Sequence, residues 1–265
     1  MTRFPAGSGP EIAGRQRALV AAFRAAKGSP AHAALERYLG SPLPVLGVRV
    51  PEFRRLLARF DRDLGPRTPR ELRAVLRSLW GGGTYEERLS AIELLDRRPG
   101  ARDGPTWRLV DRWVDEATGW ALSDSLASGP VAAWAAAEPE RFSDLLAWTR
   151  SPNLWRRRAA SYALHDWVRA GALDRPFVLL ERLLDDPEFW VQRAVGTWLR
   201  ECWKADRRRT ERFLEEHVAR LAPVTITVAT ERAPRSFRSA LRRVHRGGVP
   251  RQRSHRGPRP KRARS

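Results

Sequence analysis

An internal repeat constrains the fold of this chain more than any other feature of its sequence. The segment SPNLWRRRAASYAL (151–164) matches DPEFWVQRAVGTWL (186–199) at an offset of 35 residues. The offset places Pro152, Trp155, Arg158 and Ala159 on Pro187, Trp190, Arg193 and Ala194. Weaker copies begin at Thr84 and Thr118. Helix pairs that recur about every 35–45 residues are typical of HEAT and armadillo repeats. We therefore predict an all-α chain, an α-solenoid of HEAT-like helical repeats with one helix of each pair along a concave face.

The apolar residues recur with helical spacing through most of the chain. In residues 51–65 they form one stripe, made of Phe53, Leu56, Leu57 and Phe60. Residues 68–80 begin with Thr68, a proline and Glu71, and residues 84–98 begin with Thr84 and Glu87, which is the spacing of a capping box. Only VTITVAT (224–230) looks extended, and we expect it to be a connecting loop rather than part of a sheet.

The chain is divided by these patterns into three parts. We expect an N-terminal helical segment over residues 1–30, a HEAT-like repeat domain over 31–243 and a disordered basic tail over 244–265. The tail is rich in arginine and interrupted by glycine and proline, a composition that does not form a packed core. It is either an arm that tethers the protein to DNA or a solubilising extension.

Positive charge dominates the sequence. The chain has 50 Lys and Arg against 30 Asp and Glu, a formal net charge of +20. Residues 242–265 hold ten of the basic residues and no acidic one, so half of the net charge lies in the folded body. A basic body followed by a basic arm indicates a polyanionic partner, and we expect the concave face to bind nucleic acid.

Several classes of site and location are disfavoured by composition. Cys202 is the single cysteine, and the five histidines form no H-x-x-x-H pair, so we expect no disulfide, no metal site and no cofactor. The N-terminus lacks the apolar core of a signal peptide, and no stretch approaches the roughly 20 apolar residues of a membrane span. We expect a cytoplasmic, nucleoid-associated monomer with no membrane contact.

The candidate catalytic and DNA-binding residues fall on the predicted inner helices. Trp120 and Asp124 are four positions apart and share one helix face. Trp155, Arg158, Trp190, Arg193 and Trp198 follow on the next two inner helices and come close if the repeats stack in register. Each tryptophan could instead be core, and each arginine solvated or paired. Asp124 could equally cap a turn, pair with an arginine such as Arg158, or be the reactive group of an active site.

Four segments, in order and with suitable spacing, resemble the AlkD family of bacterial DNA alkylation-repair glycosylases, which are HEAT-like-repeat proteins. The resemblance spans about residues 35 to 242. It rests on ERYLGSPLPVLGVRVPEFRRL (36–56), GWALSDSLA (119–127), SPNLWRRRAA (151–160) and EFWVQRAVGTWLRE (188–201). It implies a DNA repair enzyme, although the family also contains members without demonstrated glycosylase function.

The resemblance also implies roles for particular residues. In that family a tryptophan, an aspartate four positions later and an arginine of the next repeat form the catalytic centre, and these positions fall on Trp120, Asp124 and Arg158. A tyrosine near the start of the family, which contacts DNA, falls on Tyr38. We further expect DNA contacts from Trp155, Trp190, Trp198 and Arg193, and phosphate contacts from Arg156, Arg157 and Arg158 along the inner helices.

The sequence departs from the family pattern at two places. Gly119 and Ala121 stand where the family usually has a first tryptophan and a first aspartate of the catalytic segment. In the later repeat the family usually has a glycine followed directly by tryptophan, and here Thr197 occupies the tryptophan position with Trp198 one residue on. One residue is about 100° of helix rotation, so one wall of the site differs.

A single carboxylate suits one kind of substrate. A purine alkylated at N3 or N7 is already cationic and leaves as a neutral base, so no general acid is needed and Asp124 alone could stabilise the developing sugar cation. We therefore expect a monofunctional DNA glycosylase that excises N3- and N7-alkylated purines, such as 3-methyladenine and 7-methylguanine, from duplex DNA without a base-flipping pocket. The alternatives are a non-catalytic solenoid that binds damaged or branched DNA, and a protein-interaction scaffold.

Overall fold

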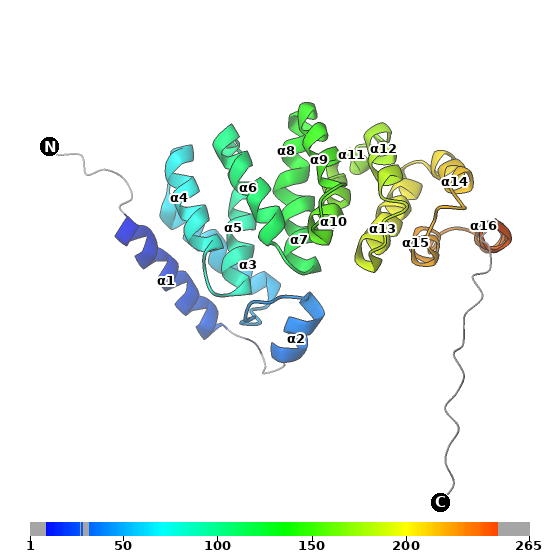
Figure 1. Ribbon diagram of the computed structural model, residues 1–265. Helices are drawn as coiled ribbons and strands as arrows, with labels where there is room; N and C mark the ends of the chain where they lie inside the picture. The colour runs from blue at the N-terminus through cyan, green and yellow to red at the C-terminus, as the bar shows by residue number, and fades with distance from the viewer. Residues whose placement is uncertain (1–8, 27, 29–31, 249–265) are drawn as a thin grey trace, which may run out of the picture.

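A computed structural model describes residues 9–26, 28 and 32–248 of the chain, and these form a row of stacked helices joined by short turns (Figure 1). No strand occurs among the residues described, which confirms the all-α prediction. The chain enters through α1 (Gly9–Ala25), α2 (His32–Leu39) and α3 (Val50–Leu64). Helices then alternate between two layers, as expected for a solenoid of helical repeats.

One layer lies along the lower side of the solenoid in Figure 1, and we call it the inner row. It contains α5 (Tyr85–Arg97), α7 (Trp120–Leu126), α10 (Leu154–Tyr162), α13 (Phe189–Ala205) and α15 (Pro223–Ala229). Successive helices of this row pack against one another, α5 on α7, α7 on α10, α10 on α13 and α13 on α15. The row therefore brings together side chains from repeats that are distant in sequence.

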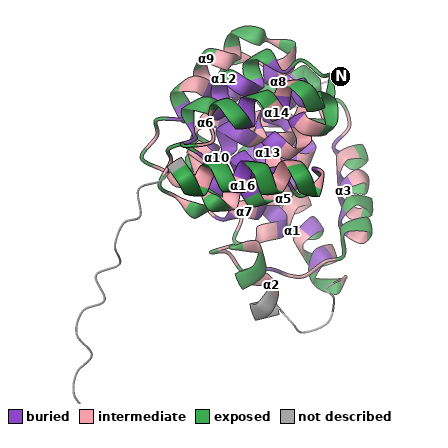
Figure 2. Cartoon of the chain, turned by 90° about the vertical axis from the view of Figure 1, so that its right-hand side faces the viewer, coloured by how far each residue is buried: buried purple, intermediate pink, exposed green. Residues whose placement is uncertain are grey.

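The outer layer backs the inner row. It contains α4 (Pro69–Trp80), α6 (Gly104–Glu116), α8 (Ala132–Ala137), α9 (Phe142–Trp148), α12 (Asp174–Arg182) and α14 (Arg207–Glu216). Short helical turns join the layers, namely η1 (Pro99–Ala101), η2 (Ala127–Val131), η3 (Pro139–Arg141) and α11 (His165–Arg169), and α16 (Arg235–Gly248) ends the described chain. Buried residues lie between the layers, while the outward surfaces are exposed (Figure 2).

Local sequence signals account for the helix boundaries. The Thr68 hydroxyl accepts a hydrogen bond from the Glu71 backbone N–H, and the Glu71 carboxylate accepts from the Thr68 N–H, a complete capping box at α4. The Thr84 hydroxyl likewise accepts from the Glu87 N–H at the start of α5. The predicted stripe of α3 is buried at Phe53, Leu57 and Phe60.

Tryptophan fills much of the space between the layers. Trp80 stacks on Trp113 with ring centroids 4.4 Å apart, and Trp107 meets Trp134 edge to face at 5.1 Å. All four side chains are buried, so each is core, as the packing alternative for the tryptophans anticipated.

One secondary-structure prediction was wrong. Residues 223–229 form helix α15 rather than an extended loop, with Pro223 in its first turn. The β-branched pattern is overridden because this segment packs closely on α13: a Cβ placed on Gly196 would lie 2.9 Å from the Cβ of Val228. The Thr225 hydroxyl donates to the backbone carbonyl of Gln192, which fixes the register of the two helices.

The chain ends differ in part from the predicted division. Helix α16 continues to Gly248, so the predicted tail begins inside a helix, and residues 249–265 lie outside the described residues. The predicted N-terminal segment contains α1, while residues 1–8, 27 and 29–31 are likewise not described. Among the residues that are described, no helix is both long and apolar enough to cross a lipid bilayer.

Candidate functional site

Asp124 and Arg158 form a bidentate ion pair between neighbouring inner helices. The Arg158 Nε donates to Asp124 Oδ1 and Nη2 donates to Oδ2, both at 2.7 Å. The side chain of Asp124 is 13% exposed and that of Arg158 is 5% exposed. Parallel N–H···O bonds of this kind fix the plane of a carboxylate as well as its position. Asp124 is therefore held rigidly, with part of its surface open to solvent.

The same guanidinium reaches a third helix. Arg158 Nη1 donates to the backbone carbonyl of Trp190 at 2.6 Å, and Nη2 also donates to the Tyr162 hydroxyl oxygen at 3.0 Å. The arginine thus joins α7, α10 and α13, and four hydrogen bonds engage four of its five N–H donors. A buried charge requires this degree of satisfaction, because an unpaired one is strongly destabilising.

These contacts correct the role expected for Arg158. The sequence led us to expect a phosphate contact from this side chain, but its donors are committed inside the protein and it is buried. Arg158 orients Asp124 instead. The structural alternative raised for Asp124, pairing with Arg158, is therefore present, and it is compatible with chemistry because each carboxylate oxygen keeps a second lone pair.

Burial raises the pKa of Asp124 above the ordinary aspartate value, because desolvation penalises the charged form. The hydrogen bonds and charge of Arg158, and a smaller contribution from the Tyr162 hydroxyl, act in the opposite direction. Burial also raises the pKa of Tyr162, and the nearby carboxylate adds to that rise. The tyrosine is consequently a neutral hydrogen-bonding group at any physiological pH.

Trp120 begins α7 and is held by α2. Its indole Nε1 donates to the Tyr38 carbonyl at 2.5 Å, and the two rings meet edge to face at 5.3 Å. Trp120 is half-buried, whereas Tyr38 is 68% exposed. The two aromatic side chains that were assigned to the site from separate segments therefore lie together, one turn along α7 from Asp124.

A contact between two glycines makes this arrangement possible. Gly40 has φ +64° and Gly119 has φ +84°, both in the left-handed region that favours glycine. A Cβ on Gly119 would lie 2.0 Å from the Gly40 carbonyl oxygen. The glycine that departs from the family pattern at position 119 thus lets the end of α2 approach the start of α7.

A cluster of aromatic side chains lies beside the ion pair at the starts of α10 and α13. Trp155 and Trp190, which the repeat aligned, have ring centroids 6.3 Å apart, and Phe189 meets Trp190 at 5.5 Å. Trp190 is 39% exposed and Phe189 is more so. Arg193, one turn after Phe189, is exposed and makes no ion pair among the residues described. Exposed aromatic rings beside an arginine suit a polymer with planar bases and an anionic backbone.

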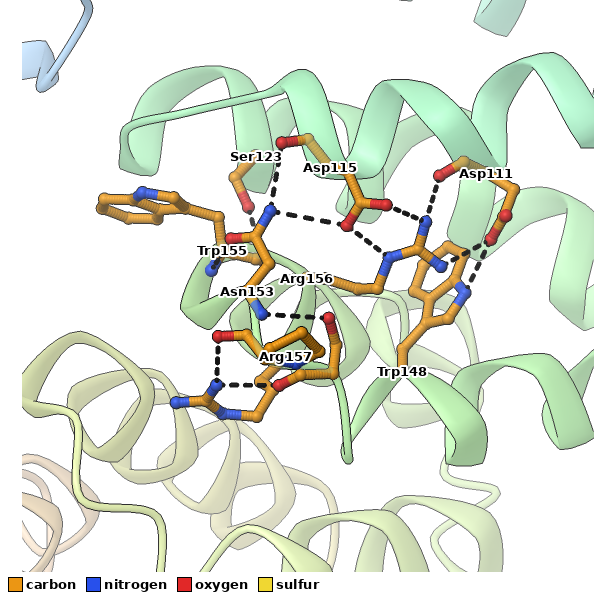
Figure 3. A network of polar contacts seen from close by, with 10 residues as sticks. Asp111, Asp115, Ser123, Trp148, Asn153, Trp155, Arg156 and Arg157 are labelled. Atoms are coloured by element: carbon orange, nitrogen blue, oxygen red, sulfur yellow. Dashed lines mark hydrogen bonds and ion pairs between the residues drawn. The ribbon is translucent and has the colours of Figure 1, made fainter.

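Arg156 and Arg157 do not lie free on this surface, which corrects a second expectation. Figure 3 shows Arg156 donating to Asp111 and Asp115 of the preceding outer helix, where it also lies over the Trp148 ring. Arg157 pairs with Asp186 and donates to the carbonyl of Ser151. Both guanidiniums join repeats to one another, so their positive charge is largely neutralised within the protein.

Trp198 also lies elsewhere than expected. It is 5% exposed and packs edge to face against Tyr162 at 5.5 Å, beneath the surface of the inner row. Thr197 is half-buried and its hydroxyl donates to the Arg193 carbonyl within α13. Because Trp198 is directed into the core, it does not supply an aromatic ring at the surface beside Thr197.

Two features of the site were absent from the sequence interpretation. Tyr162 was not singled out, although its place four residues after Arg158 puts it on the same helix face. The helix after Asp124 widens into the π-turn η2, where Pro130 lacks an N–H donor and Gly129 has φ −95° and ψ −107°. The Ser128 hydroxyl donates to the Asp124 carbonyl at 2.7 Å and satisfies an acceptor near this irregular turn. No cluster of three metal-ligating side chains occurs in the described part of the chain.

The chain belongs to the DNA alkylation repair enzyme family, whose sequence pattern matches residues 19–233. This confirms the resemblance inferred from the four motifs and places the protein among enzymes of DNA alkylation repair, with DNA as a binding partner. No curated protein matches the chain.

Solved structures show the same fold. A predicted DNA alkylation repair enzyme from Enterococcus faecalis is 18% identical, with a TM-score of 0.68, covering 79% of this chain and 97% of that one. AlkD2 from Streptococcus mutans is 16% identical, with a TM-score of 0.57 and coverage of 76% and 96%. The smu.31 protein from Streptococcus mutans UA159 is also 16% identical, with a TM-score of 0.54 and coverage of 69% and 100%.

We predict that Gly119→Ala destabilises the protein and separates Tyr38 from Trp120. The substitution forces a side chain into a positive-φ conformation that is essentially restricted to glycine, at a cost of about 1–3 kcal/mol, and adds a clash with the Gly40 carbonyl. Gly171→Ala is the matched control, because Gly171 has φ +70° but nothing lies within 4 Å of its added Cβ. Urea unfolding should show the larger loss for Gly119→Ala, and equal losses would contradict the contact.

Proposed function

We propose that this protein is a monofunctional DNA glycosylase that hydrolyses the N-glycosidic bond of cationic N3- or N7-alkylated purines in duplex DNA. The observation that carries the proposal is the geometry of Asp124, a single carboxylate fixed by Arg158 beside the aromatic cluster and partly open to solvent. The family assignment supports DNA alkylation repair as the biological setting.

The chemistry needs only one acidic group. When the bond between the purine nitrogen and C1′ breaks, its electron pair neutralises the cationic base, and an oxocarbenium-like charge develops on the sugar. Asp124 would stabilise that charge, and water would add at C1′ and release a proton to solvent. Opposite charges about 4 Å apart at an effective dielectric near 20 attract by roughly 4 kcal/mol, equivalent to about a thousandfold in rate.

Arg158 has a supporting role in this proposal. It sets the plane of the carboxylate through two hydrogen bonds and favours the ionised form, which offsets part of the rise in the Asp124 pKa that burial causes. Preorganised groups of this kind lower the barrier because they need not reorient during the reaction. Tyr162 completes the arrangement by accepting from the same guanidinium.

The aromatic side chains would position the damaged nucleotide. Trp120 would pack against the sugar and exclude bulk water, with Tyr38 beside it at the surface. Trp155 and Trp190 would extend that contact to neighbouring nucleotides. Because Tyr38, Phe189 and Trp190 are exposed, they offer the duplex an open wall, and we propose that the lesion stays stacked in the DNA during the reaction.

Position 197 motivates a second candidate function. Thr197 leaves the wall near Tyr162 without an exposed aromatic ring, since Trp198 is buried. The corresponding protein would be a solenoid that recognises damaged or branched DNA without cleaving it. Salt-sensitive DNA binding without release of any alkylated base would favour this candidate over the glycosylase.

We predict that Asp124→Asn abolishes release of 7-methylguanine and 3-methyladenine from alkylated duplex DNA while DNA binding persists. The amide lacks the charge that stabilises the sugar cation, so the single-turnover rate should fall by about a thousandfold. Released bases are measured by chromatography after incubation with saturating enzyme.

Asp186→Asn is the matched control for that experiment. The Asp186 side chain is 5% exposed and pairs with Arg157 of α10 through two hydrogen bonds, so this variant loses an equivalent ion pair that does not involve Asp124 or Arg158. It should release bases at the rate of the unsubstituted protein wherever it remains folded. Equal release by the protein and its Asp124→Asn variant would remove Asp124 from the mechanism.

We also predict an acidic limb in the pH–rate profile. The raised pKa of Asp124 means that the carboxyl takes up its proton at a higher pH than an exposed aspartate, whose pKa is about 3.9. Base release should therefore be constant above the Asp124 pKa and fall about tenfold per pH unit below it. The measurement is the single-turnover rate against pH, with Asp124→Asn giving the background of spontaneous loss. A rate that stays constant down to the pH of acid unfolding would show that no such group titrates.

A further inference from the structure

We propose that α16 is a duplex-binding helix that contacts DNA phosphates about one helical turn away from the nucleotide at Asp124. The inference rests on the proposed function only in taking duplex DNA as the partner. Helix α16 spans Arg235–Gly248, and the family pattern ends at residue 233, so the family assignment does not account for this helix.

The charge of α16 is strongly one-sided. Its sequence RSFRSALRRVHRGG contains five arginines and no acidic residue. Arg235, Arg243 and Arg246 are exposed and make no ion pair among the residues described. At 3.6 residues per turn these three side chains lie within about 80° of arc, and they span about 16 Å along the axis. They therefore form a single basic stripe along one face of the helix.

The opposite face of α16 is already occupied by the protein. Leu241 is buried, and Phe237 packs against the hydrophobic core. The other two arginines lie beside the stripe and bind within the protein: Arg242 donates to the Thr227 hydroxyl of α15, and Arg238 donates to the carbonyls of Glu231 and Ala233 just before the helix. An amphipathic helix that inserts into a membrane needs a free apolar face. Leu241 and Phe237 of that face pack against the protein, and Val244 is its exposed apolar residue. One exposed valine is a small apolar surface, so the exposed arginines suit a soluble polyanion.

Helix α16, which carries this stripe, lies beside the same row of helices as the site. Figure 1 shows α16 next to α15, at the end of the row that contains α7, α10 and α13, and Figure 2 shows it lying across that end of the solenoid. Neighbouring helices pack about 8–10 Å apart, so four such steps from α7 amount to roughly 32–40 Å. One turn of B-DNA is about 34–36 Å, after which the same side of the backbone faces the protein again.

Most basic residues on α10 and α13 are paired with acidic residues and are not available to bind phosphates. Arg156, Arg157 and Arg158 of α10 are all ion-paired, and on α13 Arg200 and Lys204 pair with Glu201. Arg193 is the exposed basic residue of α13 without an ion pair among the described residues. Sequence-independent affinity depends on the number of phosphates neutralised. Because the arginines of α10 are already ion-paired within the protein, the exposed arginines of α16 would supply phosphate contacts that α10 does not.

The test compares the full-length protein with the triple variant Arg235→Gln, Arg243→Gln, Arg246→Gln. Binding to an undamaged duplex with more than a full turn on each side of its centre is measured by fluorescence anisotropy over a range of salt concentrations. Losing three phosphate contacts should lower the slope of log K against log salt by about 2.7 and weaken binding by at least roughly tenfold at low salt. A duplex of about ten base pairs should bind both proteins alike, since it cannot reach α16 from the site.

Two control variants distinguish the loss of contacts at α16 from the loss of net positive charge alone. The variant Arg70→Gln, Arg77→Gln, Arg108→Gln removes the same charge from exposed positions of the outer helices α4 and α6 and should leave binding unchanged. Replacement of the three α16 arginines by lysine should restore most of the affinity. Equal binding by the α16 triple variant and the unsubstituted protein would overturn the proposal, as would an equal loss in the outer-helix variant.

Further outcomes separate this proposal from its competitors. Binding to vesicles of equal parts phosphatidylcholine and phosphatidylserine that depends on the α16 arginines would indicate a membrane partner and count against DNA. If the unsubstituted protein binds duplex DNA but releases no alkylated base, the glycosylase proposal fails while α16 can still be tested. At saturating enzyme the α16 variant should keep the single-turnover rate of base release, because Asp124 is untouched.

Discussion

The candidate site depends on one ion pair, Asp124 with Arg158. Bringing two charges out of water costs several kcal/mol per ion, and only close geometry and complete hydrogen bonding recover that cost. Arg158 meets this condition by donating to Asp124, to Tyr162 and to the carbonyl of Trp190, so that α7, α10 and α13 are fixed relative to one another. The same contacts leave a carboxylate at the surface of the row whose orientation is set before any substrate arrives. The hydrogen bonds of Arg158 thus both hold the stacked repeats together and orient the Asp124 carboxylate.

Much of the fold could be predicted because solenoids are built from local signals. The repeat of 151–164 in 186–199 indicated stacked helix pairs, and the Thr68 and Thr84 caps lie where their spacing predicted them. Register between repeats follows from the same periodicity, which is why Trp155 and Trp190 are neighbours in space. Helix α15 was missed because β-branched residues favour strands, and here tertiary packing on Gly196 of α13 decides the outcome.

The details of the site were harder to predict because they depend on partners far apart in sequence. Arg156 finds Asp111 and Asp115 on the preceding outer helix, and no local pattern distinguishes it from an arginine that faces DNA. Trp198 is turned into the core by its position on α13, and Gly119 is explained only by its contact with Gly40. While Arg156, Arg157 and Arg158 of α10 are committed to internal pairs, α16 offers exposed arginines at the end of the inner row that make no ion pair among the described residues.

The central claim is that one fixed carboxylate suffices because the substrate brings its own positive charge. The most direct measurement compares release of 7-methylguanine, a cation in the duplex, with release of neutral hypoxanthine from the same sequence position under single-turnover conditions. A neutral purine needs a general acid to leave, and both carboxylate oxygens of Asp124 accept hydrogen bonds from Arg158, which orients the group as an acceptor rather than as a proton donor. We predict rapid, Asp124-dependent release of 7-methylguanine and no release of hypoxanthine above background. Release of hypoxanthine at a comparable rate would contradict it.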